Sequence, residues 1–128
     1  MRLKNLSLPF STQVFKSFSE EPRVRILNLL FHKDELCISD LEHILEFTQT
    51  KTSRHLVYLK NAGMVGYRKV DQWVFYYIKE EVWDFLSRIL DFLQKDQTLK
   101  NDLDTYETLY SNRELAVNKI KSHKLKKD

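Results

Sequence analysis

Residues Thr48 to Ile78 read TQTKTSRHLVYLKNAGMVGYRKVDQWVFYYI, and this stretch decides the fold. Its first half predicts a helix that Thr48 caps and that Gly63 ends in the left-handed conformation. The inner side of this helix is expected to carry Thr52, Leu56, Leu59 and Ala62. The second half alternates between apolar and other residues, as two strands of a hairpin do. Its tip at residues 70–72 lacks glycine, so we expect a looser or slightly longer loop than a two-residue turn.

Three helices are expected before this stretch. Apolar spacing predicts one helix over residues 10–18, behind a Ser11-Thr12 start, and a second from Pro22 to about residue 33. Residues 35–38 are short enough for a single strand. Ser39 is expected to cap the third helix, because an acidic residue three positions later completes a capping box.

A long amphipathic helix is expected to open at Glu80, after the hairpin. Its apolar stripe consists of Val82, Phe85, Leu86, Ile89, Phe92 and Leu93. After a break near Asp96-Gln97 the stripe resumes as far as Tyr110. We therefore expect one domain over residues 1–110, followed by a basic, flexible tail over residues 111–128, whose last residues, HKLKKD, are expected to be disordered.

The composition fits one domain with one core, since 128 residues of which 42% are hydrophobic can bury a core. Two glycines and two prolines disfavour an all-β fold with many tight turns. The single cysteine excludes an internal disulfide and suits a reducing compartment. No apolar run reaches the roughly 18 residues that span a membrane, and the N-terminus lacks the pattern of a signal peptide. A cytoplasmic protein with no membrane partner is expected.

Charge is distributed in blocks along the chain. Residues 47–72 hold five bases and one acid, residues 80–107 hold three bases and eight acids, and residues 113–128 hold six bases and two acids. A polyanion would approach the first block and be repelled from the second. Charge alone leaves two interpretations open, nucleic-acid binding or helices whose signs alternate by chance.

The order of these segments is typical of a mainly α fold with a small β-hairpin, the winged helix-turn-helix. The chain resembles the ArsR/SmtB family of bacterial winged-helix repressors from about Val14 to Ile78 and into the following helix. The matching segments are EEPRVRILNLL (20–30), ELCISDL (35–41), SRHLVYLKNAGMV (53–65) and the hairpin ending in YYI (76–78). The resemblance implies a homodimer, built by the N- and C-terminal helices, on a palindromic operator.

Candidate DNA contacts lie at the polar start of the helix behind Thr48. The major groove admits one helix, whose short polar side chains and arginines read base edges. We expect such contacts from Gln49, Thr50, Lys51, Ser53 and Arg54. Gln49 suits adenine and Arg54 suits guanine. The alternative is a solvated helix face. For His55, facing DNA and anchoring the helix both stay open.

The hairpin tip supplies a second candidate contact, to the DNA backbone. Arg68, Lys69 and Gln72 flank the tip, where bases would bind phosphates and make binding depend on salt. The alternative is a set of charges that protects an edge strand against aggregation. The hairpin aromatics are expected to pack on the core rather than stack on bases, and the bases of the tail to be solvated rather than bound to DNA.

The sequence departs from metal-sensing relatives of the family. Many of them carry ELCVCDL with paired cysteines, whereas here Cys37 keeps the first position and Ser39 replaces the second. One thiolate and a hydroxyl make a poor site for soft metals. Other relatives use Asp and His pairs on the last helix, but no histidine lies between residues 80 and 96. We expect no metal, no cofactor and an unknown inducer. Cys37 is expected to be a buried apolar residue, with a reactive thiol as the alternative.

These features together predict a transcriptional regulator, a repressor, that binds double-stranded operator DNA as a homodimer. The wide apolar stripe after Glu80 and the apolar first helix provide surface for the second copy. The alternative is a winged-helix module that binds proteins and no specific DNA. An enzyme is not expected, because the chain has no Ser/His/Asp order, glycine-rich phosphate loop, HExxH or CxxC.

Overall fold

The computed structural model describes residues 5–120, and the central helix of the deciding stretch is α4 (Gln49–Asn61). It begins as predicted, because the Thr48 hydroxyl accepts a hydrogen bond of 3.1 Å from the backbone N–H of Lys51. It ends as predicted, because Gly63 adopts a φ of +81° that other residues rarely reach. The expected inner side is also confirmed: Thr52, Leu56, Leu59 and Ala62 are buried.

The hairpin consists of β2 (Val65–Val70) and β3 (Trp73–Ile78). Val70 pairs with Trp73, so only Asp71 and Gln72 form the turn. The prediction of a longer loop was therefore wrong. Asp71 takes the positive φ, of 56°, that was assumed to need glycine, and aspartate tolerates this conformation better than most residues.

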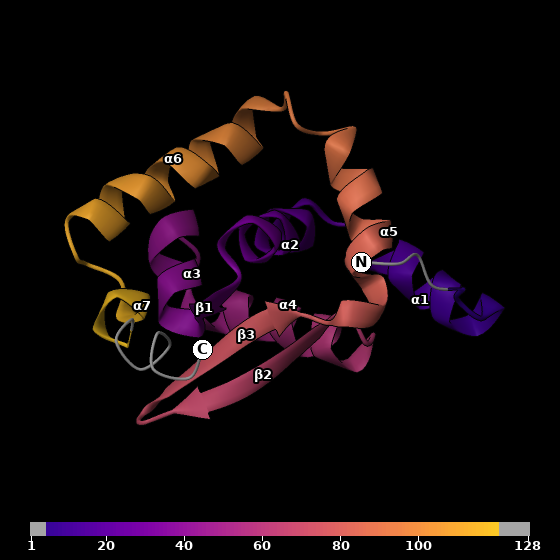
Figure 1. Cartoon of the computed structure of the whole chain (residues 1–128), viewed down its shortest axis with the longest axis horizontal. Helices are drawn as coiled ribbons and strands as arrows, with labels where there is room; N and C mark the ends of the chain where they lie inside the picture. The colour runs from indigo at the N-terminus through magenta and orange to yellow at the C-terminus, as the bar shows by residue number, and fades with distance from the viewer. Residues whose placement is uncertain (1–4, 121–128) are drawn as a thin grey trace.

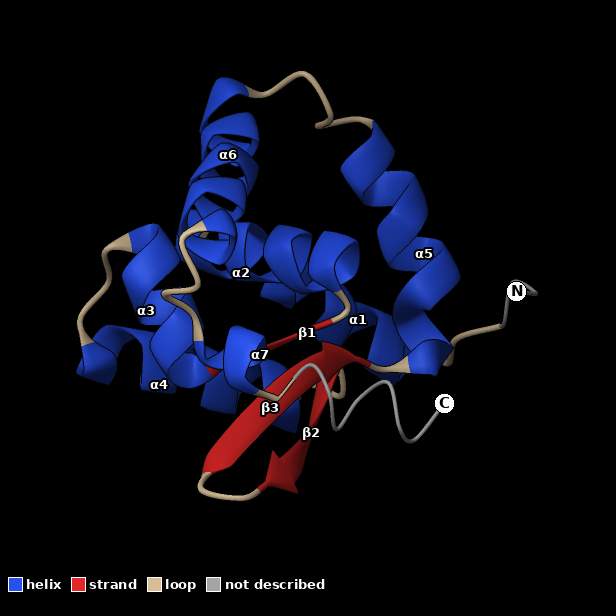
Figure 2. Cartoon of the chain, turned by 60° about the vertical axis from the view of Figure 1, so that its left-hand side comes forward, coloured by secondary structure: helices blue, strands red, loops and turns tan. Residues whose placement is uncertain are grey.

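A third strand, β1 (Glu35–Cys37), confirms the short strand predicted from the sequence. It pairs antiparallel with β3, with Glu35 opposite Tyr77, so the sheet has the order β1-β3-β2. In Figures 1 and 2 the far end of the β2–β3 hairpin projects beyond the helices. The hairpin tip therefore lies clear of the helices.

The helices before α4 are α1 (Leu8–Ser17), α2 (Glu21–Lys33) and α3 (Ile38–Leu45). Two of the predicted helix starts were wrong. α1 begins earlier, because Ser7 caps it through the Phe10 N–H (3.2 Å). α3 begins at Ile38, because Asp40 accepts a 3.2 Å hydrogen bond from the Cys37 N–H. Ser39 lies inside this helix and is not its cap.

After the hairpin the chain forms α5 (Glu80–Asp91), α6 (Gln97–Ser111) and the short α7 (Ala116–Lys119). The predicted break is confirmed, since Asp96 caps α6 by accepting from the Leu99 N–H (3.0 Å). α6 runs back over α2 and α3, and α7 packs against β1 (Figure 1). No helix within residues 5–120 is long and apolar enough to cross a membrane.

The segment after residue 110 differs from the predicted flexible tail as far as Ile120. Leu115, Ala116, Val117 and Ile120 are buried in the core. Asp40, itself 1% exposed, holds them in place: its carboxylate accepts from the N–H groups of Ala116 (2.6 Å) and Val117 (3.2 Å). The tail sequence HKLKKD lies outside the described residues.

Candidate nucleic-acid interface

The five residues predicted at the start of α4 lie within its first two turns. Gln49, Thr50, Ser53 and Arg54 line one shallow surface depression, with Gln49, Thr50 and Arg54 exposed. The Lys51 ammonium lies apart, 4.2 Å from the centre of the Phe47 ring. The structure therefore brings four of the five side chains together and places the fifth beside them.

The electrostatics of this helix end suit an anion. The first N–H groups of a helix have no partner within it and carry the positive end of its dipole. The Thr48 hydroxyl accepts a hydrogen bond from the Lys51 N–H, and the side chains of Lys51 and Arg54 add full positive charges at this end of the helix. A phosphate or an electronegative base edge would find both donors and positive charge here.

The predicted wing residues separate into two groups. Lys69 and Gln72 are exposed near the turn. Arg68 instead makes a two-pronged ion pair with Glu35 of β1, with its Nε and Nη2 at 2.9 and 2.5 Å from the two carboxylate oxygens. Glu35 is only 6% exposed, so its charge needs this partner. The Arg68 guanidinium therefore binds Glu35 and links β2 to β1 within the sheet.

Two exposed residues near this surface, Lys60 and Tyr67, were not among the predicted contacts. The Lys60 ammonium lies 5.1 Å from the centre of the Tyr67 ring, and both residues are exposed. They link the second half of α4 to β2. The alternation of side chains along a strand could have predicted Tyr67, because it lies two residues from Lys69 and so shares its face of the sheet.

His55 anchors α4, which resolves the two interpretations of this residue. Its side chain is 1% exposed, and its Nδ1 has no hydrogen-bond partner among residues 5–120. Burial lowers the pKa of His55 below its ordinary value, and the nearby Arg54 lowers it further, against a weaker opposite effect of Glu20. The buried imidazole of His55 is therefore neutral near pH 7.

Cys37 is 4% exposed, in keeping with the predicted buried apolar residue, and Ser39 Oγ lies 3.5 Å from its Sγ. Among the residues that the structure describes, no three His, Cys, Asp or Glu side chains cluster closely enough to hold a metal ion. The one thiol and one hydroxyl at this position do not fit a soft metal, which needs several thiolates.

The helices α2, α3 and α4, followed by a β-hairpin, define a winged helix-turn-helix protein. Residues 20–67 match the model of the arsR family of bacterial regulatory proteins. The chain is 39% identical to the arsenic resistance transcriptional regulator ArsR1 of Pseudomonas putida, over 60% of each chain. It is 35% identical to the arsenical resistance operon repressor of Escherichia coli, over 67% of this chain and 74% of that repressor.

Among solved structures, HlyU from Vibrio cholerae superposes with a TM-score of 0.61 and 30% identity, over 66% of this chain and 91% of HlyU. The chain belongs to the ArsR family of bacterial regulatory proteins. It spans less than two thirds of the length of ArsR1 from Pseudomonas putida, at 60%.

Proposed function

We propose that this protein is a DNA-binding transcriptional regulator, a repressor, that acts in the cytoplasm as a homodimer on a palindromic operator. One observation carries the proposal: Gln49, Thr50, Ser53 and Arg54 surround a single depression at the start of the second helix of a helix-turn-helix. The relative from Escherichia coli is named as an operon repressor, which supports the direction of regulation.

In this proposal the start of α4 enters the major groove. Arg54 donates two hydrogen bonds to guanine and Gln49 pairs with adenine, while Thr50 and Ser53 bind base edges or phosphates. Lys51, beside Phe47, clamps a phosphate. At the wing, Lys69 and Gln72 hold the flanking backbone, and Arg68 supports the strand that presents them through its ion pair with Glu35.

The second copy is proposed to bind along α1 and α5. Phe15 of α1 meets Phe85 of α5 edge to face, with ring centroids 5.6 Å apart, so the two helices form one surface. That surface exposes Leu8 (81%), Phe15 (59%) and Phe92 (87%), which is costly for a monomer. A two-fold axis there would place two copies of α4 about one DNA turn apart, roughly 34 Å.

The test replaces both cations at the start of α4, as Lys51→Ala with Arg54→Ala. Loss of one base contact and one phosphate contact should weaken operator binding by roughly a hundredfold and lower the salt slope by about one to two. The matched control is Lys95→Ala with Lys100→Ala, which removes two exposed cations from the acidic segment 80–107. Equal binding by both double variants would contradict the proposal and favour a protein-binding winged helix.

A further inference from the structure

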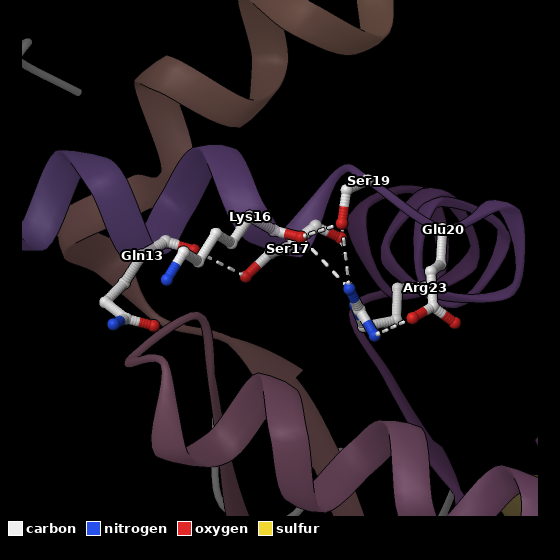
Figure 3. Close-up of polar contacts among 6 residues, drawn as sticks. All are labelled: Gln13, Lys16, Ser17, Ser19, Glu20 and Arg23. Carbon is white, nitrogen blue, oxygen red and sulfur yellow. Dashed lines mark hydrogen bonds and ion pairs between the residues drawn. The ribbon is translucent and has the colours of Figure 1, made fainter.

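Arg23 is a buried arginine that connects the end of α1 to α2. It is 4% exposed, although it lies in the first turn of α2. Its Nε donates to the carbonyl of Ser17 (3.2 Å), and its Nη2 donates to the carbonyl of Lys16 (3.0 Å) and to Ser19 Oγ (3.2 Å). Its Nη1 lies 3.3 Å from the Glu20 carboxylate (Figure 3).

These acceptors include the carbonyls at the C-terminal end of α1, where a helix lacks its own donors and carries partial negative charge. Ser19 Oγ also donates to the Lys16 carbonyl, at 2.7 Å, so the hydroxyl and the guanidinium share one acceptor. Figure 3 shows this network at the point where α1 ends and α2 begins. The guanidinium therefore fixes the position of α1 relative to α2.

The same guanidinium stacks on α4, the proposed recognition helix. Its central carbon lies 3.9 Å from the centre of the Tyr58 ring, in the second half of α4. α1 also approaches the turn that follows α4, because a Cβ at Gly63 would lie 2.9 Å from the Phe10 ring. The first contact links α1 through Arg23 to the second half of α4, and the second places α1 against the turn where α4 ends.

Figure 1 shows α1 at the edge of the molecule, beside α5. Its outer side exposes Leu8 and Phe15, which a second copy would cover. We propose that Arg23 is a positioning residue that couples α1 to the recognition helix α4, an inference that rests on the proposed role of α4 in reading DNA. A second copy docked on α1 then fixes the angle at which α4 is presented to the groove.

Only arginine suits this position. A planar guanidinium donates in its plane to the α1 carbonyls and to Glu20 while its face stacks on Tyr58. A lysine ammonium is a point charge with three donors and no flat face. Arg23→Lys should therefore keep the charge and lose the connection between the two helices.

The first test is amide hydrogen exchange in the whole 128-residue chain without DNA. Arg23→Lys should speed exchange about tenfold at Ser19, whose N–H bonds the end of α1, and also at Ala62 and Gly63, whose N–H groups bond the end of α4. The control Asp102→Asn breaks the α2–α6 ion pair to Arg25, and should speed exchange in α6 but not at Ala62. Faster exchange at Ser19 alone would overturn the coupling.

A second pair of variants keeps the inference testable even if Arg23→Lys folds poorly. Tyr58→Phe retains the ring under the guanidinium, and Tyr58→Leu removes it. Tyr58→Leu should speed exchange at Ser19 and weaken operator binding about tenfold at unchanged dimer affinity, whereas Tyr58→Phe should behave as the wild type in both measurements. Equal behaviour of the two variants would overturn the inference.

The two measurements separate this inference from the proposed function. Exchange needs no DNA, so a protein that binds no operator yet shows linked exchange at Ser19 and Ala62 contradicts the function and supports the coupling. A protein that binds its operator, but whose Tyr58→Leu variant binds equally well with unchanged exchange, contradicts the coupling alone.

Discussion

At the scale of single residues, Arg54 and Lys51 are expected to have different effects on DNA binding. Arg54 lines the depression at the start of α4, whereas the Lys51 ammonium lies over Phe47. Arg54→Ala should relax the preference for guanine at one operator position, at a cost of about 1–3 kcal/mol. Lys51→Ala should weaken binding to all sequences alike and lower the salt slope by about one.

Salt-dependent titrations of specific and unrelated duplexes measure both effects. Thr108→Ala, an exposed change on α6, serves as the control and should alter neither. If Arg54→Ala, like Lys51→Ala, weakened binding to the specific and the unrelated duplex by the same factor, the two residues would not have separate roles.

Arg68 is expected to matter for folding more than for DNA binding. Arg68→Ala leaves the buried Glu35 carboxylate without its cation, and should reduce the free energy of unfolding by about 2 kcal/mol. Lys69→Ala, one residue further along β2, should change stability by less than about 0.5 kcal/mol and weaken DNA binding instead. Urea unfolding of both variants measures the difference. Equal stabilities would show that the ion pair contributes nothing.

His55 makes stability depend on pH near neutrality. Its folded-state pKa lies below the ordinary value of about 6.5, because burial disfavours the charged imidazole. Below about pH 6.5 the unfolded chain therefore binds a proton that the folded protein does not bind until the pH is lower. The contribution to stability is complete above that pH and is lost as the pH falls through the folded pKa.

Urea unfolding at about pH 7.5 and about pH 5.5 measures this loss, and His55→Gln should reduce it. His32, whose pKa is also lowered by burial, acts with the same sign, so His32→Gln should remove a further part. The buried Asp40, whose pKa burial raises, acts with the opposite sign in all the variants and cancels from the comparison. An unchanged pH dependence in His55→Gln would contradict a neutral buried imidazole.

At the scale of elements, the sequence predicted the helix boundaries that depend on the chemistry of neighbouring residues. The cap at Thr48, the left-handed stop at Gly63 and the break at Asp96 follow from neighbouring residues and are confirmed. The predicted start of α3 was wrong because the capping box joins Cys37 to Asp40, whereas the preference for serine as a cap pointed to Ser39. α7 was missed because its four residues gain their order from burial against distant elements.

Asp40 is expected to hold the C-terminal segment on the body. Asp40→Ala leaves the N–H groups of Cys37, Ala116 and Val117 without their acceptor, and should reduce the free energy of unfolding by about 3 kcal/mol. Asp40→Asn keeps one acceptor oxygen and should cost less. Asp104→Ala, an exposed change on α6, is the control. Limited proteolysis should cut the Asp40→Ala protein first in the α6–α7 connection, and resistance there would contradict the role of Asp40.

At the scale of the whole molecule, the candidate site was predictable where helix geometry alone gathers residues. Four polar positions within two turns of α4 share one depression because of the helical repeat. The ion pair between Arg68 and Glu35 joins residues 33 positions apart, on two strands with β3 between them, so no local sequence pattern predicts it. The stacking of Arg23 on Tyr58 is hidden for the same reason.

Dimer formation is expected to depend on the surface formed by α1 and α5. Phe15→Glu puts a charge where a second copy would bury an aromatic ring, and should produce a folded monomer in sedimentation measurements. Thr108→Glu places the same charge on exposed α6 and should leave the dimer intact. A Phe15→Glu protein that still dimerises would locate the interface elsewhere.

The central claim is that a dimer presents two copies of α4 to a palindromic operator, and selection of bound duplexes from random DNA tests it most directly. At about 0.15 M salt, where non-specific attraction is screened, the wild-type protein should enrich a palindrome whose half-sites lie about 10 base pairs apart. Enrichment of no palindrome, or of sequences that the Lys51→Ala, Arg54→Ala double variant enriches equally well, would contradict it.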